Sequence, residues 1–128
     1  MKCLHFKYIG FNLFIRLITS TILTIPFLLA SINTQAATAS FYGSKFHGKK
    51  TASGEVFDMN KMTCASNTHK MGTKLKVVNR ANKKSVVCRV NDRGGFSKYG
   101  RTLDMSIGSF RKIADTSVGV IKVNIRSL

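Results

Sequence analysis

The segment Lys74-Leu-Lys-Val-Val-Asn-Arg-Ala-Asn-Lys-Lys-Ser-Val-Val-Cys-Arg-Val90 determines the fold class of this chain. Residues 74–79 and 85–90 are rich in side chains that favour strands, and the five residues between them include Asn82, a residue type that tolerates a positive φ. The segment therefore predicts two strands joined as a β-hairpin, with Asn82 at the positive-φ position.

The same preference for strands is found elsewhere in the chain. Residues 121–126, Ile-Lys-Val-Asn-Ile-Arg, alternate apolar and polar side chains, as does a strand with one buried face. Residues 39–42 and 62–65 are shorter strand candidates. These segments predict a mainly β protein.

One helix is predicted among the strands. Apolar side chains recur on one helical face of residues 107–114, and Ser106 precedes them as a candidate N-cap. Asp104 lies just before this helix, near the positive end of its dipole. Many short strands and a single helix predict a small closed β-barrel, because closure leaves no long sheet edge exposed.

The N-terminal region has the composition of a secretory signal peptide. Basic residues precede an almost uninterrupted apolar run at residues 17–31, and small residues up to Ala36 predict cleavage after that position. Residues 1–36 are thus the expected signal peptide, and residues 37–128 are one domain, expected to be a monomer. An uncleaved anchor is the less favoured alternative, because the run is too short to span a bilayer comfortably. No Cys follows the run to carry a lipid, so no stable membrane anchor is expected.

The chain is strongly basic, with 21 Lys and Arg against five Asp and Glu and a formal charge of +16. Inside a cell this balance would indicate nucleic acid as the partner. After export to the periplasm or another extracytoplasmic compartment, anionic wall polymers and lipid head groups are the available polyanions, and no nucleic acid is expected. Solubility alone is the alternative explanation of the charge.

Cys64 and Cys88 are the two cysteines outside the expected signal peptide. Export to an oxidising compartment favours a disulfide between them, and two buried thiols are the alternative. No metal site is expected, since neither Cys has a nearby Cys or a suitably spaced His.

Carboxylates are scarce, and four of the five lie in short segments that also contain Gly or Ser. The five are Glu55, Asp58, Asp92, Asp104 and Asp115. Acids near loops are frequently used for proton transfer, whereas turn formation and helix capping are their ordinary structural roles.

Five of the segments, taken together, resemble the rare lipoprotein A (RlpA) family over residues 39–125. They are Ala39-Ser-Phe-Tyr-Gly43, Phe46-His-Gly48, Thr51-Ala-Ser-Gly-Glu-Val-Phe-Asp58, Val90-Asn-Asp-Arg-Gly94 and Arg101-Thr-Leu-Asp-Met-Ser106. The resemblance implies a six-stranded double-psi β-barrel, a fold shared with expansins. It also implies endolytic cleavage of peptidoglycan glycan strands between MurNAc and GlcNAc, with a 1,6-anhydro product, a preference for strands without stem peptides, and no cofactor.

The resemblance also indicates site residues. Asp92 is the first choice for a single acid that protonates the glycosidic oxygen and later acts as the base, and Asp104 is its rival. Glu55 and Asp58 are expected to line the groove for the sugar. Arg93 is a candidate to orient a carboxylate or to bind a lactyl group, and structural pairing is the favoured alternative for it.

One segment departs from the family pattern. The family has Thr-Ala-Ala-His where this chain has Thr63-Cys-Ala-Ser66, so Ser66 occupies the position of the family's active-site His. His69 lies three residues further on, and an odd spacing along a strand puts it on the opposite face. This change motivates the alternative of a non-catalytic, expansin-like module that binds or loosens the wall. A secreted cationic protein that acts through charge alone is a third alternative.

Overall fold

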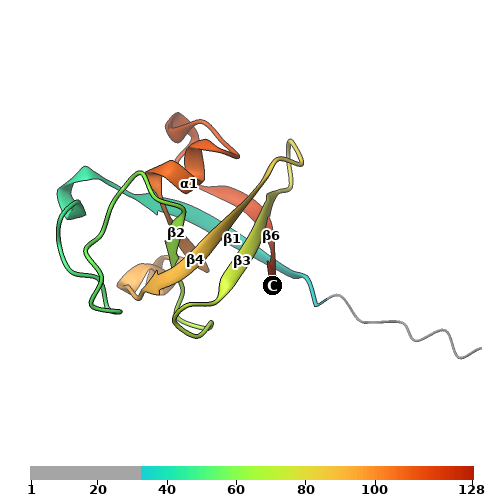
Figure 1. Ribbon diagram of the computed structural model, residues 1–128. Coiled ribbons are helices and arrows are strands. Elements are labelled where there is room, and N and C mark those ends of the chain that lie inside the picture. The colour runs from blue at the N-terminus through green and yellow to red at the C-terminus, as the bar shows by residue number, and fades with distance from the viewer. Residues whose placement is uncertain (1–32) are drawn as a thin grey trace, which may run out of the picture. The chain divides into compact units, whose positions relative to one another are not determined.

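The computed structural model describes residues 33–128, and six strands in this range form a closed barrel with the order β1-β5-β2-β4-β3-β6 (Figure 1). The strands are β1 (Gln35–Tyr42), β2 (Thr63–Ala65), β3 (Lys74–Asn79), β4 (Ser85–Asp92), β5 (Leu103–Ser106) and β6 (Ile121–Ser127). The pairs β1–β5 and β2–β4 are parallel, and the other four pairs are antiparallel. The prediction of a six-stranded barrel with one short helix is confirmed.

Most of the expected signal peptide lies outside the described residues. Within them, β1 already includes Gln35 and Ala36, which pair with Ile125 and Asn124 of β6. Cleavage after Ala36 would therefore leave β1 to begin at Ala37. No helix within residues 33–128 is long and apolar enough to cross a membrane.

The β3–β4 hairpin follows the sequence prediction, except at its turn. The positive φ of 63° belongs to Lys83 and not to Asn82, so that prediction is wrong. The Asn82 side chain is used instead: its Nδ2 donates to the Ile113 carbonyl (2.9 Å), and its Oδ1 accepts from the Lys84 N–H (3.0 Å). Asn82 thus ties the hairpin to the segment that follows the helix.

The helix is shorter than predicted. Helix α1 spans Ile107–Arg111, and the Ser106 side chain caps it by accepting from the Ser109 N–H (3.1 Å). The predicted C-terminal part forms a tight turn in which Ile113 N–H donates to the Phe110 carbonyl (3.0 Å). The side-chain amides of Asn79 and Asn82 donate hydrogen bonds to the Ile113 carbonyl, so the segment after the helix is held against the β3–β4 hairpin.

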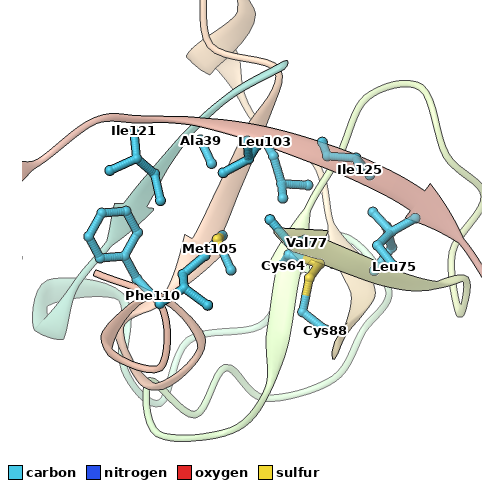
Figure 2. Close-up of a cluster of buried hydrophobic side chains, with 13 residues drawn as sticks. Ala39, Cys64, Leu75, Val77, Cys88, Leu103, Met105, Phe110, Ile121 and Ile125 are labelled. Carbon is cyan, nitrogen blue, oxygen red and sulfur yellow. A yellow bond between two sulfur atoms is a disulfide. The ribbon is translucent and has the colours of Figure 1, made fainter. Parts of the chain in front are cut away.

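The barrel interior is a single apolar cluster to which every strand contributes (Figure 2). Helix α1 adds Phe110, which is fully buried beside Met105 and Ile121 in this cluster. A disulfide joins Cys64 of β2 to Cys88 of β4 within it, and both residues are fully buried. The bridge therefore connects two neighbouring parallel strands through the core.

Helix α1 touches the β1–β2 connection at Gly108. A Cβ atom at this position would lie 2.3 Å from the Asn60 carbonyl oxygen and 2.7 Å from its carbon, both of them backbone atoms. The close approach is also fixed by the Gly108 N–H, which donates to the Met59 carbonyl (2.8 Å). Residues 59–60 and the helix are therefore in backbone contact, with no room for a side chain.

Replacement of Gly108 by Ala is expected to destabilise the domain by about 2–3 kcal/mol, because overpacking against backbone outweighs the better helix propensity of Ala. Urea unfolding of the wild type and the variant measures this difference. Gly95→Ala is the matched control, since the nearest atom to its Cβ would be the side-chain Cε of Lys98 at 3.9 Å. Equal stability of the Gly108→Ala variant and the wild type would contradict the close contact.

Candidate active site

An open pocket of about 580 Å³ lies where four strands of the barrel meet. Tyr42 ends β1, Ala65 ends β2 and Asp92 ends β4, while Asp104 lies within β5, and all four residues line the pocket. The connections that follow β1 and β4 supply most of the remaining wall. In Figure 1 both connections lie on the left side of the barrel.

Ala65 brings the two aspartates together. It pairs with Asp104 of β5 on one side and, across a register shift, with Asp92 of β4 on the other. Two inter-strand spacings place the two aspartate Cα atoms about 10 Å apart. The short Ala65 side chain leaves the space between the two carboxyl groups to the pocket.

Asp104 is buried, with 9% of the residue exposed. Its Oδ1 accepts a hydrogen bond from Ser40 Oγ (2.7 Å), and Arg101 Nη1 lies 3.8 Å from the same oxygen. Burial raises the pKa of Asp104, and the nearby charge of Asp92 adds to this rise, while the Ser40 hydrogen bond and Arg101 act in the opposite direction. Asp104 is therefore a carboxyl group that holds its proton to a higher pH than an ordinary Asp.

Asp92 is half-buried and has a different environment. Its Oδ1 accepts from the backbone N–H groups of Ala52 (2.9 Å) and Arg93 (2.8 Å). Two backbone N–H donors on one oxygen fix the orientation of the side chain. The Ser40 hydroxyl donates to Oδ1 of Asp104, and the two backbone N–H groups donate to Oδ1 of Asp92, while both carboxyl groups line the pocket.

Tyr42 lies beside the two aspartates. Its ring stacks on Phe57, with 4.5 Å between the ring centroids, and its hydroxyl is enclosed with no hydrogen-bond partner among residues 33–128. Burial is the main reason that the pKa of Tyr42 is raised, and the charges of Asp92 and Asp104 raise it further. Tyr42 therefore remains a neutral proton donor next to the carboxyl groups.

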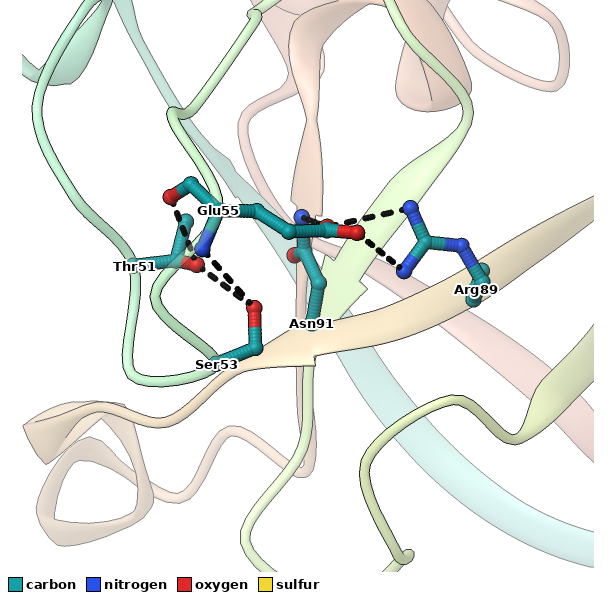
Figure 3. A network of polar contacts seen from close by, with 5 residues as sticks. All are labelled: Thr51, Ser53, Glu55, Arg89 and Asn91. Atoms are coloured by element: carbon teal, nitrogen blue, oxygen red, sulfur yellow. Dashed lines mark hydrogen bonds and ion pairs between the residues drawn. The ribbon is translucent and has the colours of Figure 1, made fainter.

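Glu55 lies outside the pocket, in a polar network on the outer side of β4 (Figure 3). Its carboxylate accepts from Arg89 Nη2 (3.0 Å) and Asn91 Nδ2 (3.1 Å), and the Arg89 hydrogen bond is the main cause of its lowered pKa. Thr51 Oγ1 donates to the Glu55 carbonyl (3.0 Å) and closes the same loop. The same loop supplies the Ala52 N–H that donates to Asp92. Glu55 is therefore linked to the pocket indirectly, through the loop that it helps to hold.

Asp58 is also absent from the pocket wall. Its Oδ1 accepts from the Asn60 N–H (2.9 Å), which makes it a turn former, and it lies 4.0 Å from His47 Nδ1. Glu55 and Asp58 were expected to line the groove for the sugar. Neither residue is among those that line this pocket.

Ser66 and His69 are in contact, although strand alternation predicted that they would lie on opposite faces. The chain leaves β2 after Ala65 and turns, so the alternation of a strand does not apply, and Ser66 Oγ lies 2.9 Å from His69 Nδ1. Ser66 Oγ also accepts weakly from the N–H groups of Thr68 and His69, so it stabilises the turn. Neither residue lines the pocket of the two aspartates.

Arg93 does line the pocket, and its Nη1 donates to the Ser66 carbonyl. Three further residues of the site, Ser40, Tyr42 and Arg101, lie within the segments that carry the family resemblance but were not predicted as site residues. Ser40 is placed beside Asp104 by the parallel register of β1 and β5. The sequence alone does not show this register, so it carried no signal for Ser40.

A family model described as lytic transglycolase matches residues 34–125. A probable endolytic peptidoglycan transglycosylase RlpA of Synechocystis sp. is 50% identical over 82 residues, which are 64% of this chain and 25% of that protein. The endolytic peptidoglycan transglycosylase RlpA of Vibrio cholerae is 45% identical over 92 residues, or 72% of this chain and 35% of that protein. The chain thus spans only a quarter to about a third of the length of these relatives.

Solved structures share the fold. The apo expansin of Clavibacter michiganensis superposes with a TM-score of 0.60 at 25% identity, covering 74% of this chain and 50% of the expansin. The Streptomyces papain inhibitor has a TM-score of 0.59 at 18% identity, covering 74% of this chain and 94% of the inhibitor. The family match over residues 34–125 and the identity to RlpA proteins show that this chain belongs to the lytic transglycolase family.

Proposed function

We propose that this domain is an endolytic lytic transglycosylase that cleaves peptidoglycan glycan strands between MurNAc and GlcNAc and leaves a 1,6-anhydro end. The observation that carries the proposal is the pair of unlike aspartates in one pocket: a buried Asp104 with a raised pKa and a half-buried Asp92 held by two backbone N–H groups. Two carboxyl groups with different environments are the usual arrangement for acid catalysis at a glycosidic bond.

Asp104 is the proposed general acid. Its Oδ1 is occupied by the Ser40 hydroxyl, so the proton resides on Oδ2. In the first step this proton passes to the glycosidic oxygen while the bond from that oxygen to the muramyl C1 breaks, and C1 acquires the positive charge of an oxocarbenium-like centre.

The second step closes the anhydro ring. The muramyl C6 hydroxyl oxygen bonds to C1, and its proton returns to the Asp104 carboxylate. One bond to C1 is broken and one is formed, no water is consumed, and Asp104 ends in its starting protonation state. A single carboxyl group thereby serves as both acid and base, which requires a pKa high enough for it to be protonated at the start.

Asp92, oriented by the two backbone N–H groups, is proposed to stabilise the positive charge at C1 with its carboxylate. The family resemblance made Asp92 the first choice for the acid and Asp104 its rival. Burial and the raised pKa of Asp104 favour the reverse assignment, because the general acid must still carry its proton when the glycan binds.

The reaction requires export, since peptidoglycan lies outside the cytoplasm. We propose that residues 1–36 direct the chain there as a signal peptide, and that the domain works as a monomer on the glycan. The Cys64–Cys88 bridge supports an oxidising compartment.

A second candidate function is a non-catalytic glycan-binding module. The expansin fold and the Ser66 substitution favour it. It differs from the first proposal in one measurable way: it predicts binding without any bond cleavage.

Mass spectrometry of peptide-free sacculi incubated with the purified protein tests the proposed function. We expect soluble fragments that end in 1,6-anhydro-MurNAc, released from within strands. Hydrolysed, non-anhydro ends would contradict the mechanism. Binding to sacculi with no released fragment over pH 4–8 would favour the binding module.

A further inference from the structure

The pocket wall carries more positive charge than its two aspartates balance. Four cationic side chains line it, and two of them are engaged: Arg101 with Ser40 Oγ (2.7 Å), and Arg93 with the Ser66 carbonyl. The other two, Lys45 and Lys98, take part in no ion pair recorded for the described part of the chain. Both lysines are exposed, on separate segments that follow β1 and β4.

Aromatic rings support these lysines without neutralising them. Lys45 Nζ lies 5.1 Å from the centroid of the Phe46 ring, and Lys98 Nζ lies 5.1 Å from that of Tyr99. Both rings are exposed and line the same pocket. A cation over a ring face is attracted weakly and keeps its full charge, so each ammonium group remains free to bind an anion.

Neither lysine is among the groups that shift the pKa of Asp104. Arg101 is the pocket cation that lowers the pKa of Asp104, and it does so against the larger effect of burial. Within residues 33–128, neither Lys45 nor Lys98 forms an ion pair with Asp92 or Asp104. The free positive charge is therefore placed around the pocket without deprotonating the group that the reaction needs protonated.

We propose that Lys45 and Lys98 form a carboxylate-binding subsite at the rim of the pocket, an inference that rests on the proposed function for the identity of the glycan. A neutral polysaccharide has no anionic group to pair with these lysines, whereas a muramic-acid glycan carries carboxylates. The carboxylate has two sources: the lactyl group of a strand without stem peptides, and the acidic residues of a stem peptide. The subsite selects muramyl over neutral glycans through this charge.

The experiment measures binding in the Asp104→Asn background, so that turnover is not needed. The probes are peptide-free glycan strands, the same strands with their carboxylates converted to methylamides, peptide-bearing strands, and an uncharged chitin oligosaccharide. Lys45→Gln/Lys98→Gln is compared with Lys84→Gln/Lys122→Gln, which removes the same charge from exposed positions outside this pocket.

The pocket double variant is expected to bind peptide-free strands about tenfold more weakly than the parent, since two partly exposed ion pairs are lost, while the control changes by less than about threefold. Methylamidation should weaken the parent equally and leave the pocket variant unchanged. A loss confined to peptide-free strands identifies the lactyl carboxylate, and a loss on peptide-bearing strands identifies peptide carboxylates.

Two results would overturn the subsite: equal binding of native and methylamidated strands by the parent, or equal losses in the pocket and control variants. The proposed function fails separately. If the wild type released no anhydro ends while carboxylate-dependent binding persisted, the subsite would stand and the enzymatic role would fall.

Discussion

The Asp104→Asn variant is expected to lose the release of 1,6-anhydro fragments by a factor on the order of 10³, which is the contribution of a positioned general acid. The amide keeps the shape of the side chain and can still accept the Ser40 hydroxyl, but it has no proton to give to the glycosidic oxygen. Quantification of anhydro ends by mass spectrometry measures the loss. Asp92→Asn is expected to lose less if its charge only stabilises the transition state.

The same variant gives a second, independent signal in stability. The pKa of Asp104 is raised in the folded state, so the folded state binds this proton more tightly than the unfolded chain does. The stability that Asp104 contributes is present below its unfolded pKa and is lost as the pH rises through the raised folded pKa. Asn has no such loss, so the variant should gain stability relative to wild type over that pH window.

Activity should follow the same titration. The wild-type rate is expected to fall as the pH rises through the pKa of Asp104, because the acid is then deprotonated. Wild-type activity in the Asp104→Asn variant would contradict the assignment of Asp104 as the acid. So would a free energy of unfolding of the variant, measured relative to wild type, that fails to rise with pH over that window.

The Cys64→Ser/Cys88→Ser variant is expected to lose about 3 kcal/mol of unfolding free energy through the greater entropy of its unfolded chain. The bridged residues are 24 positions apart and fully buried, so two hydroxyl groups in their place add a desolvation cost. For a domain of this size the melting temperature should fall by about 10–20 °C. Differential scanning calorimetry measures the change.

Two comparisons separate the bridge from the side chains. The Cys64→Ala/Cys88→Ala variant avoids buried hydroxyl groups and should lose less than the Ser variant. The wild type under reducing conditions should lose stability too, and neither variant should respond to the reductant. A wild type whose melting temperature is unchanged by full reduction would show that the disulfide contributes no stability.

The strands that alternate in polarity were predictable from the sequence, and β5 was not. Residues 121–126 alternate because β6 has one exposed face, and they form a strand as predicted. Leu103–Ser106 is buried at all four positions, including the polar Asp104 and Ser106, so it has no alternation to detect. Its polar residues resemble a turn until their partners on neighbouring strands are known.

The pocket was only partly predictable, for the same reason. Asp92 and Asp104 were identified from the motifs, and both line the pocket. Their different roles depend on burial and on hydrogen bonds from Ser40 and Ala52, residues that lie 40 or more positions away in the chain. Local spacing carries no information about such contacts. The hydrogen bond between Glu55 and Arg89 is another contact, 34 positions apart in the chain, that spacing does not reveal.

The position of β1 in the barrel has a consequence for biosynthesis. Ala39 pairs with Leu103 of β5, and Gln35 pairs with Ile125 of β6. The first strand of the described chain therefore pairs only with strands near the C-terminus. Such distant pairings form late, because a long loop must close first. A chain whose last strand is not yet available therefore lacks a closed barrel, and the pocket at the end of β1 takes its final shape only after nearly all of the polypeptide has been made.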